Sequence, residues 1–543
     1  MQAVETRKRD SSVLDAIKNF GCKSARKISD ITGISKDKAQ RALNALRRRH
    51  VYPEAKLWET DLAQEWLHRM MIAAITTFVL EGGVGADRLS VFFHRVRLEK
   101  EIGVSPSALR TQIVEVEKLV ARYGTEQETV NKEKIKEIIV GGDETFFREK
   151  LILVLMELSS GYLLLEEFRE ERTFTTWQDA VSKRLGELGC EVRMFTSDRG
   201  KSLIKLALEE FGCDAGADLF HAQQDLSRWQ GLVFKRKIDK ADKAVKDAQE
   251  KLNAIDKKQI KGRSRKQAEQ KLEQACGTQY KHRQGQKKFR AALHGISKVL
   301  HPFSPEGGIQ SSTEVTCELN TQLETLAQVS ELHNIPDRRG VMDKFRRQLK
   351  DLTGRVNAWW LWADESLEAL RLDAGCKTWA KESLLPVIYW SYQVGRTDNP
   401  ELREIYSNAH KVALHAWKNH PVTKNIPQET LDNCQRWAET MTMRFQRSSS
   451  AIEGRNGCLA QMYHSTRGLS TCRLKALTVL HNFACRRRDG TTPAERLFGT
   501  GFPDIFEWVV ERSGPLPLPR KARQKKSYDP LDRKPLTGGL VAA

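Results

Sequence analysis

KIKEIIVGGDETFF, residues 134–147, begins a series of short apolar runs. Three more runs follow: EKLILVLMELSS at 149–160, GYLLLEEF at 161–168 and CEVRMFTSDRG at 190–200. Runs of this length, separated by Gly and Ser, predict β-strands, and the stretch between the third and the fourth run predicts a helix. A last short strand is predicted at ADLFH, residues 217–221. The pattern therefore predicts the start of an α/β sheet.

The strand pattern stops after this sheet, and residues 225–447 predict an all-helical insertion. From Ile238 to Ile255, apolar residues recur at alternating steps of three and four, which is typical of a coiled coil, and KGRSR at 261–265 can turn the chain back. Between 235 and 290 there are 19 Lys or Arg against 7 Asp or Glu. This basic hairpin is either a solvated surface or a contact for DNA or a partner. Trp359, Trp360 and Trp362 fill a core, or one of them stacks on a base.

The N-terminal part contains two patterns typical of helix-turn-helix modules. In residues 25–50, apolar residues at helical spacing surround Gly33, and the second helix ends in three arginines. In residues 98–120, Gly103 makes the turn and Pro106 follows at the first helical position. Each pattern also fits an ordinary helical hairpin, but two in a basic chain favour DNA reading. The predicted DNA-contacting residues are Ser35, Lys36, Lys38, Arg41, Arg47, Arg48, Ser105, Ser107 and Arg110.

Composition supports a polyanionic partner. The 543 residues carry a formal net charge of +20, which attracts phosphates, although a merely soluble basic protein has the same composition. The ten cysteines form no CxxC pair, so we expect a reducing compartment, and the spacing of Cys458, His464, Cys472, His481 and Cys485 matches no familiar zinc site. The longest apolar run, residues 70–80, is too short for a membrane span. We expect a cytoplasmic, nucleoid-associated protein of a bacterial cell.

These patterns predict six parts. They are a first helix-turn-helix domain at 1–60, a second at 61–130, the first part of an α/β core at 131–224, the helical insertion at 225–447, the second part of the core at 448–512, and a basic disordered tail at 513–543.

Three acidic residues stand where the predicted core can bring them together. Asp143 lies in or at the end of the first strand, Asp198 ends the fourth, and Glu453 lies in the first turn of a helix that follows the insertion. Three carboxylates can hold two Mg²⁺ ions for phosphodiester chemistry, and Mn²⁺ can substitute. Glu144 competes with Asp143 but should point to the opposite face of its strand. Glu157, Glu166 and Glu167 are interpreted as solvated strand residues or ion-pair partners.

The motifs, in their order, resemble those of the DDE transposases of insertion sequences. They are GGDETFF around Asp143, FTSDRGKSLIKLA around Asp198, DLFH at 218–221, SSSAIEGRNGCLAQMYHSTRGLS around Glu453, and TTPAERLFG near the end of the core. DLFH is similar to the C/D-x-x-H signature of groups whose core is interrupted by a helical domain. The separations fit as well, because 198 − 143 = 55 and 453 − 198 = 255 leave room for an insertion.

The resemblance implies an α/β catalytic core that is RNase H-like, with a mixed sheet flanked by helices, in a chain that is mostly helical overall. In this core, Asp143, Asp198 and Glu453 are catalytic metal ligands and His221 and Asp218 support the site. Asn456 touches the scissile phosphate or packs. Further phosphate contacts are predicted at Arg199, Lys201, Arg455, Lys235, Arg236 and Lys237.

The implied activity is that of an enzyme that binds terminal inverted repeats, cleaves DNA at the element's ends and joins the 3′-OH ends to target DNA, as a homodimer or higher oligomer on double-stranded DNA. Two alternatives are a non-catalytic, transposase-derived DNA-binding regulator and an RNase H-like nuclease without strand transfer.

Overall fold

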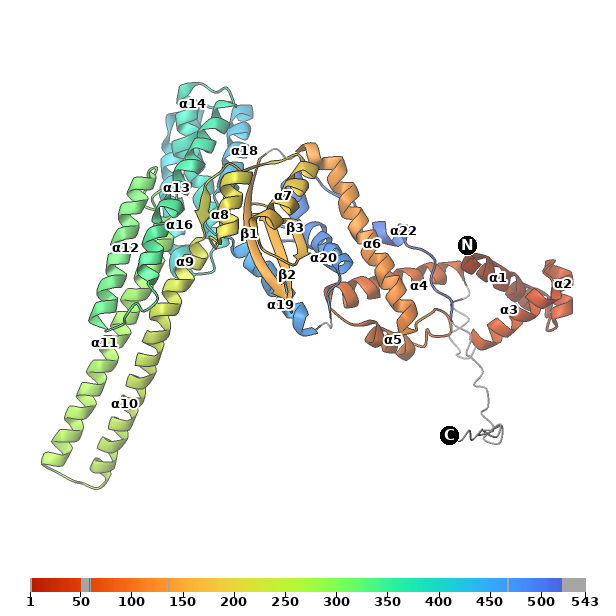
Figure 1. Ribbon diagram of the computed structural model, residues 1–543, viewed down its shortest axis with the longest axis horizontal. Coiled ribbons are helices and arrows are strands. Elements are labelled where there is room, and N and C mark those ends of the chain that lie inside the picture. The colour runs from red at the N-terminus through yellow and green to blue at the C-terminus, as the bar shows by residue number, and fades with distance from the viewer. Residues whose placement is uncertain (1, 50–57, 59, 135–136, 466–467, 520–543) are drawn as a thin grey trace, which may run out of the picture. The chain divides into compact units, whose positions relative to one another are not determined.

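The computed structural model describes residues 2–49, 58, 60–134, 137–465 and 468–519 (Figure 1). The chain divides into two compact units. Unit 1 comprises residues 1–123, 465–468 and 503–543, and unit 2 comprises residues 124–464 and 469–502. Within the described residues, no helix combines the length and the apolar character that crossing a membrane requires.

Unit 1 begins with three helices, α1 (Gln2–Phe20), α2 (Ala25–Thr32) and α3 (Lys36–Arg49). Ser24 caps α2, and Gly33 ends it with a φ of 70°, a left-handed conformation that glycine adopts without strain. Ile28, Ala39 and Leu43 are buried in a small core shared with α1. The predicted pair of helices around Gly33 is therefore present.

The remaining helices of unit 1 are α4 (Asp61–Ala74), the π-helix η2 (Ile75–Glu81), α5 (Ala86–Arg95), α6 (Pro106–Asn131, which continues into unit 2) and α22 (Ile505–Arg512).

Two predictions fail in unit 1. Residues 98–102, expected to form the first helix of the second helix-turn-helix, form turns and a bend instead of a helix, and the 26-residue helix α6 begins only at Pro106. The backbone N–H of Gly103 donates to the carbonyl of Pro517 at 2.5 Å, and a Cβ at Gly103 would lie 2.9 Å from the carbonyl oxygen of Leu518, so this segment is shaped by a tertiary contact. Residues 513–519, predicted to be disordered, have defined positions, and Leu516 is buried. The rest of the predicted tail lies outside the described residues.

Unit 2 contains a five-stranded mixed sheet in the order β3-β2-β1-β4-β5. The strands are β1 (Glu137–Phe147), β2 (Lys150–Glu157), β3 (Tyr162–Arg169), β4 (Glu191–Ser197) and β5 (Ala215–Ala217). β1, β2 and β3 pair antiparallel, whereas β4 runs parallel to both β1 and β5. The four long strands and the helix between the third and fourth are confirmed. The fifth strand was misplaced, since it ends at Ala217 and a helix begins at Leu219.

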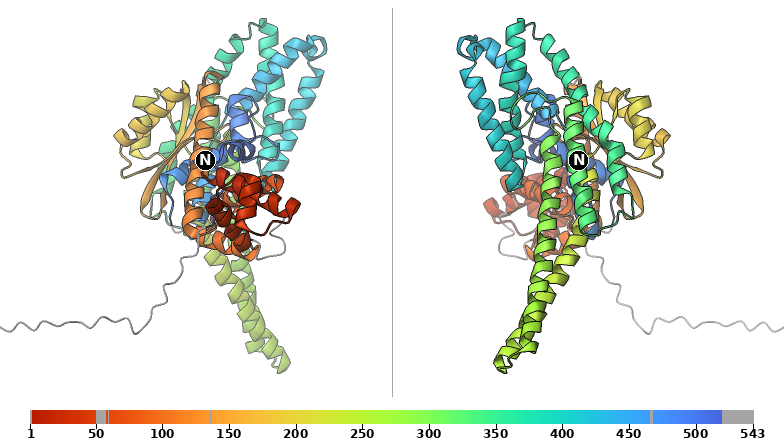
Figure 2. Two further views of the ribbon diagram at one scale, coloured as in Figure 1. Left: turned by 90° about the vertical axis from the view of Figure 1, so that its right-hand side faces the viewer. Right: turned by 90° about the vertical axis from the view of Figure 1, so that its left-hand side faces the viewer.

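Helices cover both faces of the sheet. α7 (Phe174–Leu188) and α8 (Lys201–Lys205), which continues as the π-helix η4 (Leu206–Glu210), lie on one face, and α19 (Ser450–Ser465) and α20 (Thr471–Phe483) lie on the other (Figures 1 and 2). Asn482 on α20 donates to the carbonyl of Leu163 at 3.0 Å and accepts from its N–H at 2.8 Å. This side chain satisfies backbone groups of β3, an edge strand. The short helix α21 (Pro493–Phe498) follows α20.

Residues 218–449, between β5 and α19, are helical apart from connecting loops and the isolated bridge Phe303–Ile309, and all of them are described. The elements are α9 (Leu219–Leu226), η5 (Ser227–Gly231), α10 (Leu232–Lys257), α11 (Arg263–Val299), α12 (Ser312–Leu332), α13 (Val341–Glu368), α14 (Ala374–Trp379), η6 (Ala380–Leu384), α15 (Leu385–Arg396), α16 (Pro400–Asn419), α17 (Pro421–Asn425) and α18 (Gln428–Arg444). A mostly helical chain with a small mixed sheet flanked by helices is therefore confirmed.

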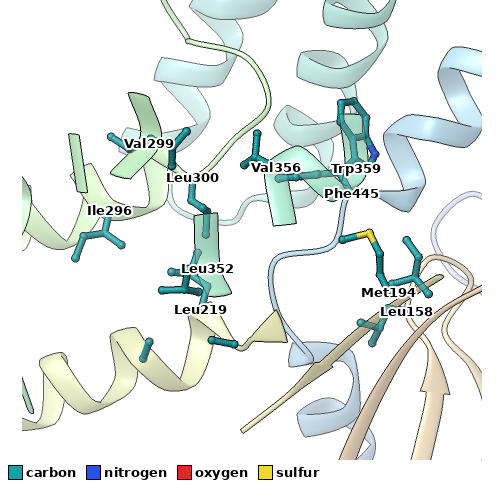
Figure 3. Close-up of a cluster of buried hydrophobic side chains, with 14 of the residues drawn as sticks. Leu158, Met194, Leu219, Ile296, Val299, Leu300, Leu352, Val356, Trp359 and Phe445 are labelled. Atoms are coloured by element: carbon teal, nitrogen blue, oxygen red, sulfur yellow. The ribbon is translucent and has the colours of Figure 1, made fainter. Parts of the chain in front are cut away.

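One apolar core connects the helical insertion to the sheet. Leu352, Val356 and Trp359 of α13 belong to the same buried cluster as Met194 of β4 and Leu219 of α9 (Figure 3). Trp359, Trp360 and Trp362 are all buried, and each indole N–H has a protein acceptor. The tryptophans therefore fill a core. By contrast, α10 and α11 form a long hairpin that projects from the rest of unit 2 (Figure 1). A hairpin was predicted from the pattern between Ile238 and Ile255 and a turn at 261–265, and the connecting residues are 258–262.

Candidate active site

The register of two parallel strands brings Asp143 and Asp198 to the same level. Gly141 of β1 pairs with Thr196 of β4, and each aspartate stands two residues after its member of this pair. Since side chains alternate between faces with a period of two, Asp143 shares a face with Gly141. Glu144 points to the opposite face, as predicted, where it accepts from Trp177 Nε1 of α7 at 3.2 Å and pairs with Arg172 at 3.1 Å.

The third carboxylate comes from α19, which packs on the face of β1 that carries Asp143. Ile452 of this helix lies against Gly141, where a Cβ would be only 2.8 Å from its Cδ1. This close approach favours glycine, since a larger residue would have to displace the side-chain ends of Ile452 and Leu158. Glu453 is the next residue, in the first turn of α19, and Asn456 stands three residues later on the same side of the helix.

Direct contacts connect the helices to the carboxylates. Asn456 Nδ2 donates to Asp143 Oδ2 at 2.8 Å. His221 Nε2, from α9, lies 3.3 Å from Glu453 Oε1. The pKa of Asp143 is raised to about 6, mainly by burial and also by the negative charges of Glu453 and Asp198, while the hydrogen bond from the Glu144 N–H and the nearby His221 oppose the shift. Asp143, Asp198, Glu453, His221 and Asn456 are therefore neighbours in space.

The chemistry of this group fits a divalent cation. No Lys or Arg among the described residues forms an ion pair with any of the three carboxylates, so no permanently charged side chain offsets their mutual repulsion. Carboxylate oxygens are ligands that Mg²⁺ prefers. Asn456 Oδ1 is buried without a hydrogen-bond partner, and His221 Nε2 makes no hydrogen bond either, although it lies 3.3 Å from Glu453 Oε1. Both polar atoms are therefore available to a bound group or its waters.

The described side chains do not form a finished metal site. In the part of the chain that the structure describes, no three His, Cys, Asp or Glu side chains stand in an arrangement that could hold a metal ion. Asn456 occupies one oxygen of Asp143, and His221 lies beside one oxygen of Glu453. Metal binding would therefore require these two carboxylates to exchange a protein neighbour for the ion.

Asp218 supports the site indirectly. It is buried and caps α9, accepting from the N–H of Phe220 at 2.7 Å. Its other oxygen accepts from the N–H of Ser449 at 2.8 Å and from the Ser449 hydroxyl. Asp218 therefore ties the start of α9, which carries His221, to the start of α19, which carries Glu453. Sequence reasoning missed Ser449, because nothing in the sequence relates it to a residue 231 positions earlier.

Arg455 is not placed to contact DNA, contrary to the prediction. Its side chain is only 8% exposed, and Nε and Nη2 each donate to the fully buried carboxylate of Glu166 at 2.7 Å. Thr478 of α20 donates to the same carboxylate at 2.7 Å. This network connects α19, β3 and α20. Glu166 is thus an ion-pair partner, one of the two roles predicted for it, and so is Glu167, which pairs with Arg169 at 2.6 Å.

Glu157 is neither solvated nor ion-paired. It is buried, and its carboxylate accepts from the N–H groups of Ser159 and Ser160 at 3.1 and 2.7 Å. It therefore stabilises the turn between β2 and β3.

Two further predicted phosphate contacts lie just after Asp198. Arg199 has a φ of 70° and pairs with Asp351 of α13, so its charge is already partnered. The Gly200 N–H donates to Asp198 Oδ1 at 2.9 Å and holds the carboxylate in this turn. Lys201 is exposed at the start of α8 and remains available to a phosphate.

The other predicted DNA contacts lie in three helical segments. Ser35 precedes α3, and the side chains of Lys36, Lys38, Arg41 and Arg47 are exposed there, while the side chain of Arg48 lies outside the described part. Ser105 caps α6, Ser107 is exposed, and Arg110 pairs with Asp87 at 3.2 Å. Lys235 and Arg236 are exposed on α10, and Lys237 is half-buried.

Comparison with known proteins gives one partial match. A model described as "Family of unknown function (DUF6399)" matches residues 380–525, which include Glu453 and Asn456 but not Asp143, Asp198 or His221. The matched segment is about a quarter of the chain, 146 of 543 residues. A search of curated proteins finds no match.

Proposed function

We propose that this chain is a DDE-type transposase, a Mg²⁺-dependent enzyme that cleaves DNA at the ends of a mobile element and joins the 3′-OH ends to target DNA. The proposal rests on one observation above all. Asp143 lies on β1, Asp198 directly follows the adjacent parallel strand β4 at the same level, and Glu453 comes near both from a helix that follows the mainly helical residues 218–449.

The fold is consistent with the RNase H-like core that the proposal requires, because the sheet is mixed and both of its faces carry helices. Asp143, Asp198 and Glu453 would hold the two Mg²⁺ ions. When bound, such ions activate the attacking oxygen and stabilise the leaving oxygen of a phosphodiester.

Other residues of the chain would orient these ligands. Asn456 holds one oxygen of Asp143, Gly200 holds one oxygen of Asp198, and His221 adjoins Glu453. These contacts would orient the carboxylates before an ion binds, which lowers the cost of assembling the site. Both oxygens of Asp143 accept hydrogen bonds, one from Asn456 and one from the Glu144 N–H, so a bound ion would replace or share one of them.

DNA binding in this proposal uses both units. The helices α2 and α3 would read the terminal inverted repeats, with the exposed basic side chains of α3 toward the DNA. The hairpin α10–α11 would contact phosphates without sequence preference, because its excess of positive charge releases counterions on binding. Cleavage of two ends and their joining to one target also requires at least a homodimer on DNA.

Two other functions use parts of the same evidence. A non-catalytic DNA-binding regulator would keep the helices of unit 1 and the basic hairpin, but would not need three converging carboxylates. A nuclease without strand transfer would need the carboxylates, but not α2 and α3.

One experiment separates the three functions. The full-length protein is incubated with Mg²⁺ and labelled duplexes that carry the ends of the DNA segment surrounding its gene. Cuts at the ends followed by joined products support the transposase. Cuts without joining would identify a nuclease, and end binding without Mg²⁺-dependent cuts would identify a regulator.

A further inference from the structure

Arg355 of α13 bridges the two points where the helical insertion leaves and re-enters the core. Its Nη2 donates to the carbonyl of Ala217, the last residue of β5, at 2.9 Å. Its Nη1 donates to the carbonyl of Gln446, which follows α18. One guanidinium therefore joins chain segments that are more than 220 residues apart in sequence.

Short paths connect both bridged carbonyls to the candidate active site. Four residues after Ala217 comes His221, and seven residues after Gln446 comes Glu453. Two further bonds join the same segments: the Leu219 N–H donates to the Arg447 carbonyl at 3.1 Å, and the Ser449 N–H donates to Asp218 at 2.8 Å. The spacing between α9 and α19, and hence the contact of His221 with Glu453, depends on this junction.

The side chain of Arg355 is tightly enclosed. A Cβ at Gly216 would lie 2.4 Å from Nη2, so the chain can pass this close to the guanidinium because residue 216 is glycine. The side chain is buried, and Nε has no hydrogen-bond partner. Burial lowers the pKa of Arg355 to about 10, with the charge of Asp218 opposing the shift.

A buried charge of this kind is a poor way to stabilise a fold, since apolar residues of similar volume often do so equally well or better. Its planar fork, however, fixes two acceptors at a set separation and angle, which a lysine or an apolar residue cannot do. The geometry is thus better explained by precision at the junction than by stability.

We infer that Arg355 is a positioning residue, by which the helical insertion sets the placement of His221 and Glu453 and so assembles the three carboxylates. The inference rests on the proposed function and deepens it, because it makes the insertion a structural part of the active site. Arg355 itself touches no reacting atom.

The test compares Arg355→Met and Arg355→Lys with Trp359→Phe in the full-length protein. Trp359 lies on the same helix and donates a buried bond to the Met441 carbonyl at 2.9 Å, so its replacement costs stability in the insertion without altering the bridge. Two readouts are used: Mn²⁺ binding to the free protein, followed by electron paramagnetic resonance, and the Mg²⁺ dependence of single-turnover cleavage of end duplexes.

We expect Arg355→Met to weaken Mn²⁺ binding and to raise the half-saturating Mg²⁺ concentration by about tenfold or more, as is typical when a partner that orients metal ligands is removed. Arg355→Lys should show a smaller change in the same direction. Trp359→Phe should lower Tm but keep the metal dependence of the wild type.

The outcomes distinguish the inference from the function on which it rests. A wild-type protein that neither binds Mn²⁺ nor cleaves end duplexes would refute the proposed function and the inference together. A wild type that does both, with an Arg355→Met variant of unchanged metal dependence, would refute the role of Arg355 alone. If Arg355→Met does not fold, Arg355→Lys decides by the same criterion.

Discussion

Replacing Arg455 by Met should destabilise unit 2 strongly while leaving DNA affinity nearly unchanged. The substitution removes a buried guanidinium that makes two bonds of 2.7 Å to Glu166 and keeps most of its aliphatic volume. The Glu166 carboxylate, which is fully buried, would then retain only the bond from Thr478.

The expected loss of stability follows from the buried Glu166 carboxylate that the substitution leaves without its partner. Leaving one member of a buried ion pair without its partner costs about 3–5 kcal/mol. At about 2 °C per kcal/mol for a large domain, the Tm of the transition that unfolds unit 2 should fall by about 6–10 °C. The double variant Arg455→Met with Glu166→Leu also removes the unpaired charge, and it should therefore regain part of the lost stability.

The assay is differential scanning calorimetry combined with the salt dependence of duplex DNA binding. Arg346→Met is the matched control, because Arg346 forms an exposed pair with Asp343 on α13 worth at most about 0.5 kcal/mol. If Arg455→Met kept the Tm of the control and instead weakened DNA binding with a shallower salt slope, Arg455 would be a phosphate contact and the role given to the buried pair would be wrong.

Three further predictions concern the site and the hairpin. Because the pKa of Asp143 is raised to about 6, the folded protein holds this proton more tightly than the unfolded chain, and stability falls as pH rises from about 4 to 6. Asp143→Asn should therefore be more stable than the metal-free wild type at pH 7–8, with a difference that shrinks toward pH 4 in urea titrations; an equal difference at both pH values would contradict this. Gly141→Ala should cost about 1–3 kcal/mol by overpacking against Ile452 and Leu158, whereas Gly454→Ala, with no atom within 4 Å, should be neutral or stabilising in the same unfolding assay. Replacing Lys235, Arg236 and Lys237 by Glu should make the slope of log affinity against log salt concentration shallower, by about 1 for each phosphate that the protein no longer neutralises, as measured by fluorescence anisotropy with duplex DNA. An unchanged slope would mean that these charges are only solvated and do not contact DNA.

The four long strands were predictable because each contains a short buried apolar stretch, such as residues 138–140 in β1 and 151–156 in β2, with clear breaks between them. The same logic failed at 217–221, where the short polar side chain of Asp218 caps a helix and the actual strand, Ala215–Ala217, contains only small residues. At 98–102 the local sequence permits a helix, but a contact with Pro517 and Leu518, some 415 residues away, fixes turns instead.

The candidate ligands could be named from the sequence because strand ends and a helix start limit where carboxylates can meet. The residues that hold them could not. Glu166 lies 289 positions before Arg455, and neither Arg355 nor Ser449 stands in a recognisable motif. Arg455 was interpreted as a phosphate contact because it stands next to a candidate metal ligand in the sequence. Its burial and its ion pair with Glu166 depend on tertiary packing, which the sequence does not show. Pairing by register, as between Gly141 and Thr196, likewise becomes visible only in the folded sheet.

The most direct test of the account is the single-turnover rate of Mg²⁺-dependent cleavage and joining for Glu453→Gln beside the wild type. Glutamine keeps the size and the hydrogen-bonding capacity of this side chain but removes the charge that would help to hold the metal ions. We predict end binding and Tm close to those of the wild type, with cleavage and joining lower by orders of magnitude, and little further decrease when Asp143→Asn or Asp198→Asn is added, since residues that act as one unit are not additive. A Glu453→Gln protein that cuts and joins at the wild-type rate in Mg²⁺ would contradict the account.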